Sequence, residues 1–150
     1  AIRELFRSKP QPASRLSIVH GDYRNGNFLF EGKHITGILD WEMAHIGDPL
    51  EDLGWALSEI WCWGKKETPA YLIPRKEALG IWTQESQIEI DEDSLLWWEL
   101  FACVKGPAIW ISAVHEFSTG KNSDPVNLFS AWLPGDIHSE IILNKLENLL

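Results

Sequence analysis

The sequence predicts an α+β fold that is mostly helical, with a small β-hairpin followed by a bundle of helices. Short apolar runs bounded by turn-forming residues lie in the first third of the chain, whereas helix-start signals and long apolar segments follow residue 48. With 150 residues, 45% of them hydrophobic, the chain is long enough for one domain with a substantial core. It contains no internal repeats, so residues 1–150 are expected to form one compact unit.

The first elements are short. AIRELF, at the start, resembles the last turns of a helix that begins before residue 1. Residue 1 is therefore expected to be a boundary within a longer protein. After the helix-breaking residues SKPQPAS, the run LSIV (16–19) predicts a short buried strand or the approach to one. FLF (28–30) and ITGIL (35–39) flank the turn-forming EGKH and predict a β-hairpin.

The hairpin places two polar residues together. Asn27 comes just before its first strand and Asp40 just after its second. In an antiparallel pair these two positions lie at the same end, so the two residues are expected to be close in space despite their separation in sequence.

Helices are predicted for the rest of the chain. In GDPLED, Asp48 suits the N-cap, Pro49 the first helical position, and Glu51 the third, where its carboxylate can reach back to the cap. The predicted helices run from Pro49 to about Trp63, from Pro74 to about Glu85, from Asp91 to about Phe117, and from Asp136 almost to the end.

Composition argues against several classes of partner. The net charge of −9 repels nucleic acids and anionic membrane surfaces, and Lys and Arg form no basic cluster. No apolar run reaches the roughly 18 residues of a membrane span. Cys62 and Cys103 lie in apolar surroundings without metal-ligand spacing, which favours buried thiols and a cytoplasmic protein.

The loop HGDYRNGN (20–27) is the candidate reaction centre. Asp22 lies in a segment too polar for a core and is suited to accept a proton from a substrate. Asn27 and Asp40 offer the hard oxygen ligands that Mg²⁺ takes when phosphates and water complete its coordination. A base together with two metal ligands indicates phosphoryl transfer, in which catalysis comes mostly from positioning and charge neutralisation.

The spacing H-x-D-x-x-x-x-N, filled by His20, Asp22 and Asn27, is that of the catalytic loop of protein kinases, in which a hairpin precedes a metal-binding aspartate. With ILDWEMAHIGDPLEDLGW following, the chain resembles the aminoglycoside phosphotransferase and choline kinase-like family. The match is specific over residues 16–57. Beyond them, WWELF and the next helix resemble the branch associated with acyl-CoA dehydrogenases.

The resemblance implies a protein-kinase-like C-terminal lobe with ATP as co-substrate and Mg²⁺ as cofactor. Asp22 would be the catalytic base, and Asn27 and Asp40 would hold the metal bound to ATP. His20 would support the loop, and Asp52 would hydrogen-bond the loop backbone.

Two positions depart from the protein-kinase pattern. Gly21 replaces an arginine, and Trp41 and Glu42 replace Phe-Gly, so control by activation-loop phosphorylation is not expected. Glu42 is a further candidate metal ligand, although a solvated loop acid would look the same.

The nucleotide clamp is missing from this stretch of sequence. No G-x-G-x-x-G loop or V-A-I-K-like strand occurs in the 150 residues, so the resemblance covers the C-terminal lobe alone. The N-terminal lobe of the same protein is therefore an expected partner. The face it would cover is expected to be apolar, and a second copy of the chain, forming a homodimer, is the other candidate to bury it.

Three functions compete at this point. The leading hypothesis is an ATP- and Mg²⁺-dependent phosphotransferase acting on a small hydroxylated metabolite. A kinase-derived binding module without catalysis is the alternative, and a metal-dependent phosphohydrolase ranks last because the clustered carboxylates and histidines of such enzymes are lacking. The acceptor stays open among hydroxyacyl, amino-alcohol and aminoglycoside compounds.

Two further features have competing interpretations. Arg24 could meet an anionic substrate, but a solvated loop charge is the favoured interpretation. The tryptophans could form a cage for a quaternary ammonium group, but aromatic residues at helical spacing more often pack in a core. The tryptophans in question are Trp55, Trp61, Trp63, Trp97, Trp98 and Trp110.

Overall fold

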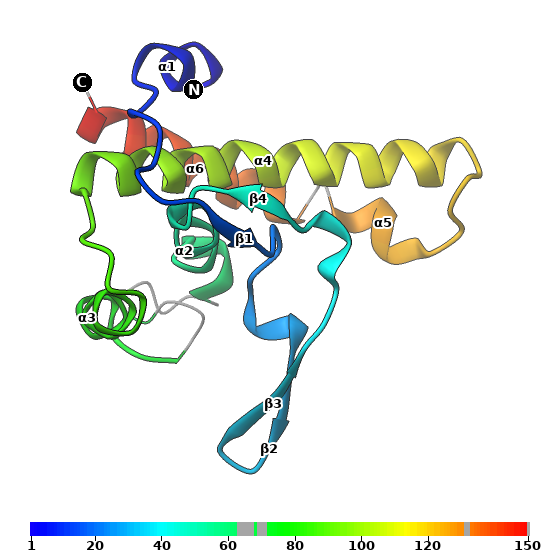
Figure 1. Cartoon of the computed structure of the whole chain (residues 1–150). Helices are drawn as coiled ribbons and strands as arrows, with labels where there is room; N and C mark the ends of the chain where they lie inside the picture. The colour runs from blue at the N-terminus through cyan, green and yellow to red at the C-terminus, as the bar shows by residue number, and fades with distance from the viewer. Residues whose placement is uncertain (63–67, 69–71, 131–132, 150) are drawn as a thin grey trace. The chain divides into compact units, whose positions relative to one another are not determined.

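The computed structural model of the protein describes residues 1–62, 68, 72–130 and 133–149 (Figure 1). These residues form two compact units, one of Lys9–Glu99 and one of Ala1–Ser8 with Leu100–Leu150. The first unit contains two small antiparallel sheets with helices, and the described part of the second contains helices only. The predicted α+β, mostly helical fold is therefore confirmed.

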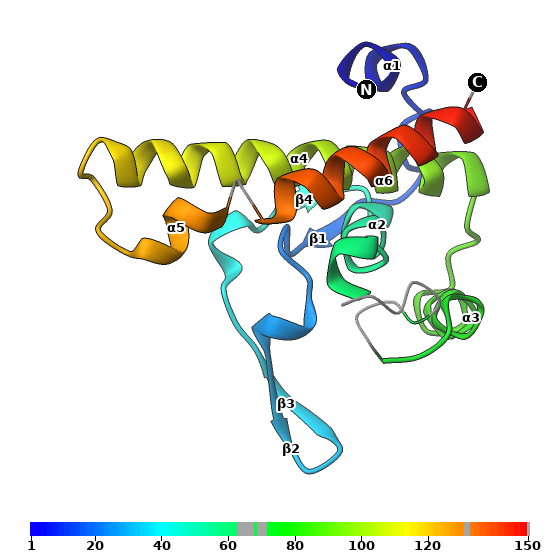
Figure 2. The same ribbon diagram turned by 180° about the vertical axis from the view of Figure 1, so that it is seen from behind.

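Four short strands lie in the first unit. Strands β2 (Phe28–Glu31) and β3 (His34–Ile38) form the predicted hairpin, which extends away from the other elements of this unit in both views (Figures 1 and 2). The predicted strand within LSIV is β1 (Ser17–Val19), and it pairs antiparallel with β4 (His45–Gly47). The pairing with β4 was not anticipated, because residues 45–47 lack the alternating pattern of a strand.

The polar loop lies between β1 and the hairpin. It ends in a short 3-10 helix, η1 (Asn25–Asn27), directly before β2, and a second one, η2 (Trp41–Met43), follows β3. The Leu39 N–H donates to the Asn27 carbonyl at 2.8 Å, which closes the end of the hairpin. The segments that carry Asn27 and Asp40 are therefore adjacent, as the hairpin predicted.

Helix α2 (Leu50–Ala56) starts where the GDPLED signal predicts. The Asp48 carboxylate accepts a hydrogen bond from the Leu50 N–H at 2.9 Å, whereas Glu51 lies 3.0 Å from the His45 ring nitrogen Nε2 instead of reaching back to the cap. Aspartate in this position satisfies one of the N–H groups that a helix start leaves without a partner.

Helix α2 is shorter than predicted. It ends at Ala56, and the 3-10 helix η3 (Glu59–Cys62) follows. From Ser58 on, the hydrogen bonds connect residues three apart, since the Ser58 N–H donates to Trp55 O and the Trp61 N–H to Ser58 O. The predicted end of this helix at Trp63 lies outside the described residues.

Helix α2 contributes most of the core of the first unit. Leu50, Leu53 and Leu57 recur at helical spacing on one face and pack with Leu95, the first buried leucine of α4. Helix α3 (Arg75–Ser86), which begins after Pro74 as predicted, packs Leu79 and Trp82 on this cluster. The buried Glu99 carboxylate also pairs with Arg75 at the start of α3.

Helix α4 (Glu92–Ser118) begins in the first unit and continues in the second. Asp91 caps it as predicted, because its carboxylate accepts hydrogen bonds from the backbone N–H and the hydroxyl of Ser94. These bonds lower the pKa of Asp91, since they stabilise its charged form.

The second unit also contains α1 (Ile2–Arg7), α5 (Pro125–Ser130) and α6 (Leu133–Leu149). The short α5 was not predicted, and α6 begins at Leu133, before the predicted start at Asp136. A proline in a first helical turn is tolerated because the N–H it lacks would have no helical partner. Pro134 is therefore compatible with the earlier start.

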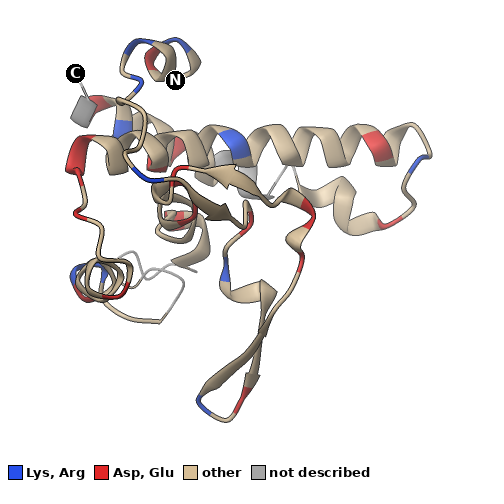
Figure 3. Ribbon diagram, viewed as in Figure 1, with Lys and Arg blue, Asp and Glu red and all other residues tan. Residues whose placement is uncertain are grey.

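Both cysteines are free and buried, as predicted. Acidic and basic residues are scattered over the described elements, and none of these elements carries a continuous basic stripe (Figure 3). Within the described residues, no helix combines the length and the apolar character needed to cross a membrane.

Candidate active site

His20 joins the polar loop to the segment before Asp40. It is almost completely buried, and its Nε2 lies 2.8 Å from the Leu39 carbonyl. Its Nδ1 accepts a hydrogen bond from the Asp22 N–H at 3.2 Å, and its ring packs on Trp41 with 4.5 Å between centroids. One neutral form, with the proton on Nε2, satisfies both hydrogen bonds.

Asp52 holds the other side of the loop. It lies in the first turn of α2 and accepts hydrogen bonds from the backbone N–H groups of His20 (2.6 Å) and Gly21 (2.9 Å). Gly21 adopts a positive φ of 87°, and a Cβ there would lie 2.8 Å from Met43. Glycine therefore permits both the backbone conformation and the close approach of the Met43 segment. These are the backbone contacts that the resemblance implied for Asp52, whose part in catalysis stays a prediction.

The Asp22 carboxylate is surrounded by donors. The Arg24 Nε–H contacts both oxygens, at 3.2 Å to Oδ1 and 3.0 Å to Oδ2. The Trp55 indole donates to Oδ1 at 2.9 Å, and the Asn27 amide donates to Oδ2 at 2.8 Å. The loop, η1 and α2 thus converge on the carboxylate that the sequence selected as the base.

Asn27 lies beside this carboxylate, and Asp40 follows Leu39, whose backbone is hydrogen-bonded to Asn27. Asn27 is buried, and its amide nitrogen donates to both the backbone and the side chain of Asp22, so its carbonyl oxygen is the atom left to bind a cation. Asp40 is exposed and has a left-handed backbone with φ of 67°. Such a conformation is uncommon for residues other than glycine and is often found at functional sites.

This donor set fits a magnesium ion held together with phosphate groups. One amide oxygen and one carboxylate suit Mg²⁺, which takes its remaining ligands from phosphates and water. Glu42, the further candidate ligand, is exposed in η2. Among the described residues, no group of three or more His, Cys, Asp or Glu side chains is arranged to hold a metal.

Sequence reasoning missed one residue of the site and misjudged another. Trp55 follows Asp52 by one turn of α2, and that spacing could have placed its indole on the same face toward the loop. The favoured interpretation of Arg24 as a solvated charge is wrong. Its guanidinium pairs with Asp22 and lies 5.2 Å from the centroid of the Trp61 ring, where a cation and an aromatic face attract each other.

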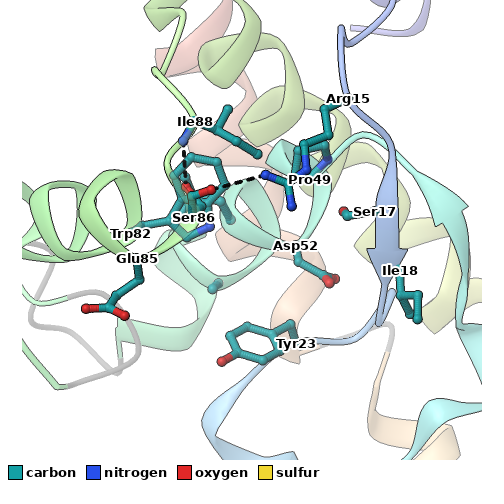
Figure 4. Close-up of a pocket in the computed structure, with 12 residues that line it drawn as sticks. Arg15, Ser17, Ile18, Tyr23, Pro49, Asp52, Trp82, Glu85, Ser86 and Ile88 are labelled. Carbon is teal, nitrogen blue, oxygen red and sulfur yellow. Dashed lines mark hydrogen bonds between the residues drawn. The ribbon is translucent and has the colours of Figure 1, made fainter.

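A cavity of about 360 Å³ adjoins the loop in the first unit (Figure 4). Tyr23 and Asp52 line it together with Arg15, Trp82 and Glu85. Burial of the ring, and secondarily the negative charge of Asp52, raise the pKa of Tyr23. The phenol is therefore kept protonated beside the residue that anchors the loop.

The sequence that forms this site matches the model of a known protein family. The model of the phosphotransferase enzyme family known as APH matches residues 1–95, which is more than half of the chain. The chain belongs to this phosphotransferase family. The resemblance based on HGDYRNGN and the GDPLEDL element is thereby confirmed.

Curated relatives of this chain match it over short stretches. Human acyl-CoA dehydrogenase family member 11 is 37% identical over 51 residues, which cover 33% of this chain and 6% of the relative. Viomycin phosphotransferase of Streptomyces vinaceus is 39% identical over 57 residues, which cover 35% of this chain and 20% of the relative. The matched segment is thus a small part of each of these longer proteins.

A solved structure shares the fold. A Ralstonia eutropha protein assigned as an aminoglycoside phosphotransferase superimposes with a TM-score of 0.66 at 20% identity. The match covers 87% of this chain and 44% of that protein, so the chain spans less than half of its structural relative. These relatives do not favour the interpretation of the chain as a binding module without catalysis.

Proposed function

We propose that the complete protein transfers the γ-phosphoryl group of ATP, with Mg²⁺, to a hydroxyl group of a small metabolite. The observation that carries the proposal is the anchored loop. Asp52 accepts hydrogen bonds from the loop backbone, and His20 connects the loop to the Leu39 carbonyl. The Asp22 carboxylate accepts a hydrogen bond from Asn27, and the Asn27 backbone carbonyl is hydrogen-bonded to Leu39, the neighbour of Asp40. Phosphoryl transfer needs this kind of fixed geometry more than it needs covalent chemistry.

The chain's own residues have distinct roles in this reaction. The acceptor hydroxyl donates its proton to Asp22 while its oxygen forms a bond to the γ-phosphorus, and the bond from that phosphorus to the β,γ-bridging oxygen breaks to release ADP. Asn27 and Asp40 would hold Mg²⁺, which neutralises charge on the phosphates when it is bound. His20 and Asp52 keep the loop in position.

A further part of the protein is needed for the nucleotide. We propose that an N-terminal lobe preceding residue 1 supplies the phosphate-covering loop and the lysine that this stretch lacks. The length of the relatives supports this, since the chain spans 44% of its structural relative.

The sheet of β1 and β4 supports a covering partner as well. Ile18 and Ile46 face each other across this sheet and are 69% and 66% exposed. Adjacent exposed apolar side chains of this kind are candidates for contact with another protein surface. We propose that the N-terminal lobe covers them, and a second copy of the chain is the alternative occupant.

We propose three classes of acceptor compound and no single acceptor. The names of the relatives point in two directions, toward the acyl-CoA dehydrogenases and toward a viomycin phosphotransferase. The surplus of acids in the chain suits a cationic amine, whereas the acyl-CoA relatives suit a hydroxyacyl compound. Hydroxyacyl, amino-alcohol and aminoglycoside acceptors are all within the proposal.

The first test is ADP release by the complete protein with ATP, Mg²⁺ and a panel drawn from the three acceptor classes. One class should stimulate ADP release, and Asp22→Asn should lower kcat by at least about a thousandfold because the general base is lost along with its orienting effect. The matched control is Asp93→Asn, which changes an exposed acid in the first turn of α4 and should retain wild-type rates.

Three outcomes would contradict the proposal. Full activity of Asp22→Asn would remove the assignment of the base. Binding of a panel compound without ADP release would favour the non-catalytic module. Phosphate release from a phosphorylated compound without ATP would favour a phosphohydrolase.

A further inference from the structure

Three N–H groups donate to the Asp22 carboxylate. A carboxylate offers about four lone-pair positions, two on each oxygen. The Trp55 indole takes one position on Oδ1 and the Asn27 amide takes one on Oδ2, and the single Arg24 Nε–H lies between the remaining position of each oxygen. An acceptor hydroxyl that is to donate its proton to Asp22 on this side must therefore displace the shared Arg24 N–H.

Burial indicates which donor can leave. Trp55 is 3% exposed, and Asn27, which is also buried, makes a second hydrogen bond to the Asp22 backbone carbonyl. The Arg24 side chain is 30% exposed, so it can exchange its contacts with Asp22 and Trp61 for contacts with water. Moving Trp55 or Asn27 would instead leave buried polar atoms without partners.

The position of Arg24 depends on the absence of a side chain at Gly26. A Cβ built on Gly26 would lie only 2.1 Å from the Arg24 Nη1, the far end of a flexible side chain. The backbone of Gly26 lies within η1 and its φ is not positive, so alanine fits the local conformation. A methyl group at this position should therefore force the guanidinium out and leave the charges of the loop unchanged.

We propose that Arg24 occupies the acceptor's place on Asp22 and that the incoming hydroxyl displaces it. In the same proposal, Trp55 is a positioning residue that keeps the carboxylate in place when Arg24 leaves. The proposal rests on the proposed function in one respect, the assignment of Asp22 as the base. The ion pair itself is a property of the chain that can be measured without any reaction.

Removing Arg24 or Trp55 from the Asp22 carboxylate should change the reaction rate in opposite directions. A purely structural role of the two residues predicts the same direction for both. Loss of Arg24 from its position removes a competitor of the acceptor, so the reaction should become faster. Loss of the Trp55 hydrogen bond lets the carboxylate rotate, so the reaction should become slower. A residue that only stabilises the fold would reduce activity in both cases, in step with stability.

The first measurement follows the Arg24 Nε–H by NMR in the complete protein labelled with ¹⁵N-arginine, without nucleotide. Arg24→Lys removes the signal and so assigns it. Hydrogen exchange of this N–H should be at least about tenfold faster in Gly26→Ala than in the wild type, because its carboxylate partner is lost. Gly80→Ala is the matched control, since nothing lies within 4 Å of its added Cβ, and it should leave the exchange unchanged.

The second measurement is ATP hydrolysis with Mg²⁺ and no added acceptor, so that water is the acceptor probe. Water donates a proton to Asp22 as its oxygen bonds to the γ-phosphorus, and ADP and inorganic phosphate are released. Gly26→Ala and Arg24→Met should each raise kcat about threefold to tenfold, while Trp55→Phe should lower it about tenfold. The KM for ATP of Trp55→Phe should stay near wild type, as should the kcat and KM of Gly80→Ala.

The outcomes separate the two proposals. Unchanged exchange of the Arg24 N–H in Gly26→Ala would overturn the occupied position, whatever the activity. Slower hydrolysis in both Gly26→Ala and Arg24→Met would overturn the competition with the acceptor and make Arg24 a supporting residue. If exchange accelerates as expected but neither hydrolysis nor transfer occurs in the wild type, the proposed function fails and the ion pair stands.

Discussion

Three aspartates of the site differ in what surrounds them. Asp52 is partly buried and accepts two backbone N–H groups, so it acts on the loop. Asp22 accepts side-chain donors at both oxygens, one of them from the partly exposed Arg24. Asp40 is exposed at a left-handed position beside the hairpin. The roles proposed for these residues thus follow from their surroundings, since the side chain is the same in each.

Tyr23 gives a prediction at this scale, because its pKa is raised by burial and by Asp52. In the unfolded chain a tyrosine loses its proton near pH 10, whereas the folded protein retains it to higher pH. Above pH 10 the folded state therefore binds more protons, and stability falls as pH rises. Urea unfolding at pH 9 and pH 11 should show a larger loss for the wild type than for Tyr23→Phe.

Other groups titrate in this range, so the difference between the two proteins is the quantity that tests Tyr23. Lysines affect both proteins alike and cancel in the comparison. An equal loss of stability in wild type and Tyr23→Phe would mean that the phenol titrates alike in the folded and unfolded states.

At the scale of elements, local signals set the starts of helices better than their ends. Asp48 and Asp91 cap α2 and α4 as their sequence patterns predict. The end of α2 at Ala56 has no such signal, since LSEIWCW continues an apolar pattern and contains no proline or glycine. The change to hydrogen bonds three residues apart accompanies a contact between Trp55 and Trp61, whose ring centroids lie 5.5 Å apart.

The cap of α2 matters because this helix carries Asp52 and Trp55. Asp48→Ala should lower the free energy of unfolding by about 1 kcal/mol, since the Leu50 N–H loses its acceptor. Asp48→Asn retains a capping oxygen and should lie within about 0.5 kcal/mol of the wild type. Urea denaturation followed by far-UV circular dichroism would measure both variants. Equal losses would mean that the charge of Asp48, and not its cap, stabilises the helix start.

At the scale of the whole molecule, the sheet of β1 and β4 exposes apolar side chains. Its residues Ile18 and Ile46 would be covered by the proposed N-terminal lobe. The chain offers a matched comparison on its own surface, because Ile46 and Val126 are 66% and 67% exposed. The two native cysteines are buried, which keeps the background reaction of a thiol reagent low.

In the complete protein, Ile46→Cys should react with a thiol reagent at least about tenfold more slowly than Val126→Cys, because burial restricts access to the sulfur. Mass spectrometry over time would measure both rates. Protection that weakens as the protein is diluted would identify a second copy as the covering partner. Equal rates at all concentrations would show that the sheet is exposed in the complete protein.

The sequence alone determined the features that depend on neighbouring residues. The helix starts at Asp48, Pro74 and Asp91 follow from capping and from proline, and the β2–β3 hairpin follows from two apolar runs around a turn. The hairpin in turn predicted that the Asn27 and Asp40 segments meet, because its geometry is local. The spacing of His20, Asp22 and Asn27, together with Asp40 and the GDPLEDL element, indicated the family.

Only the tertiary structure decided the contacts between residues that are distant in sequence. The pairing of β1 with β4, the contact of Trp55 with Asp22 over 33 residues, and the position of Arg24 on Trp61 each depend on how separate elements pack. No local pattern encodes them, because several packings satisfy the same periodicity and burial selects among them. The sequence thus identified the carboxylate at the centre of the candidate site, and the packing of α2 and η3 against the loop determined which donors surround it.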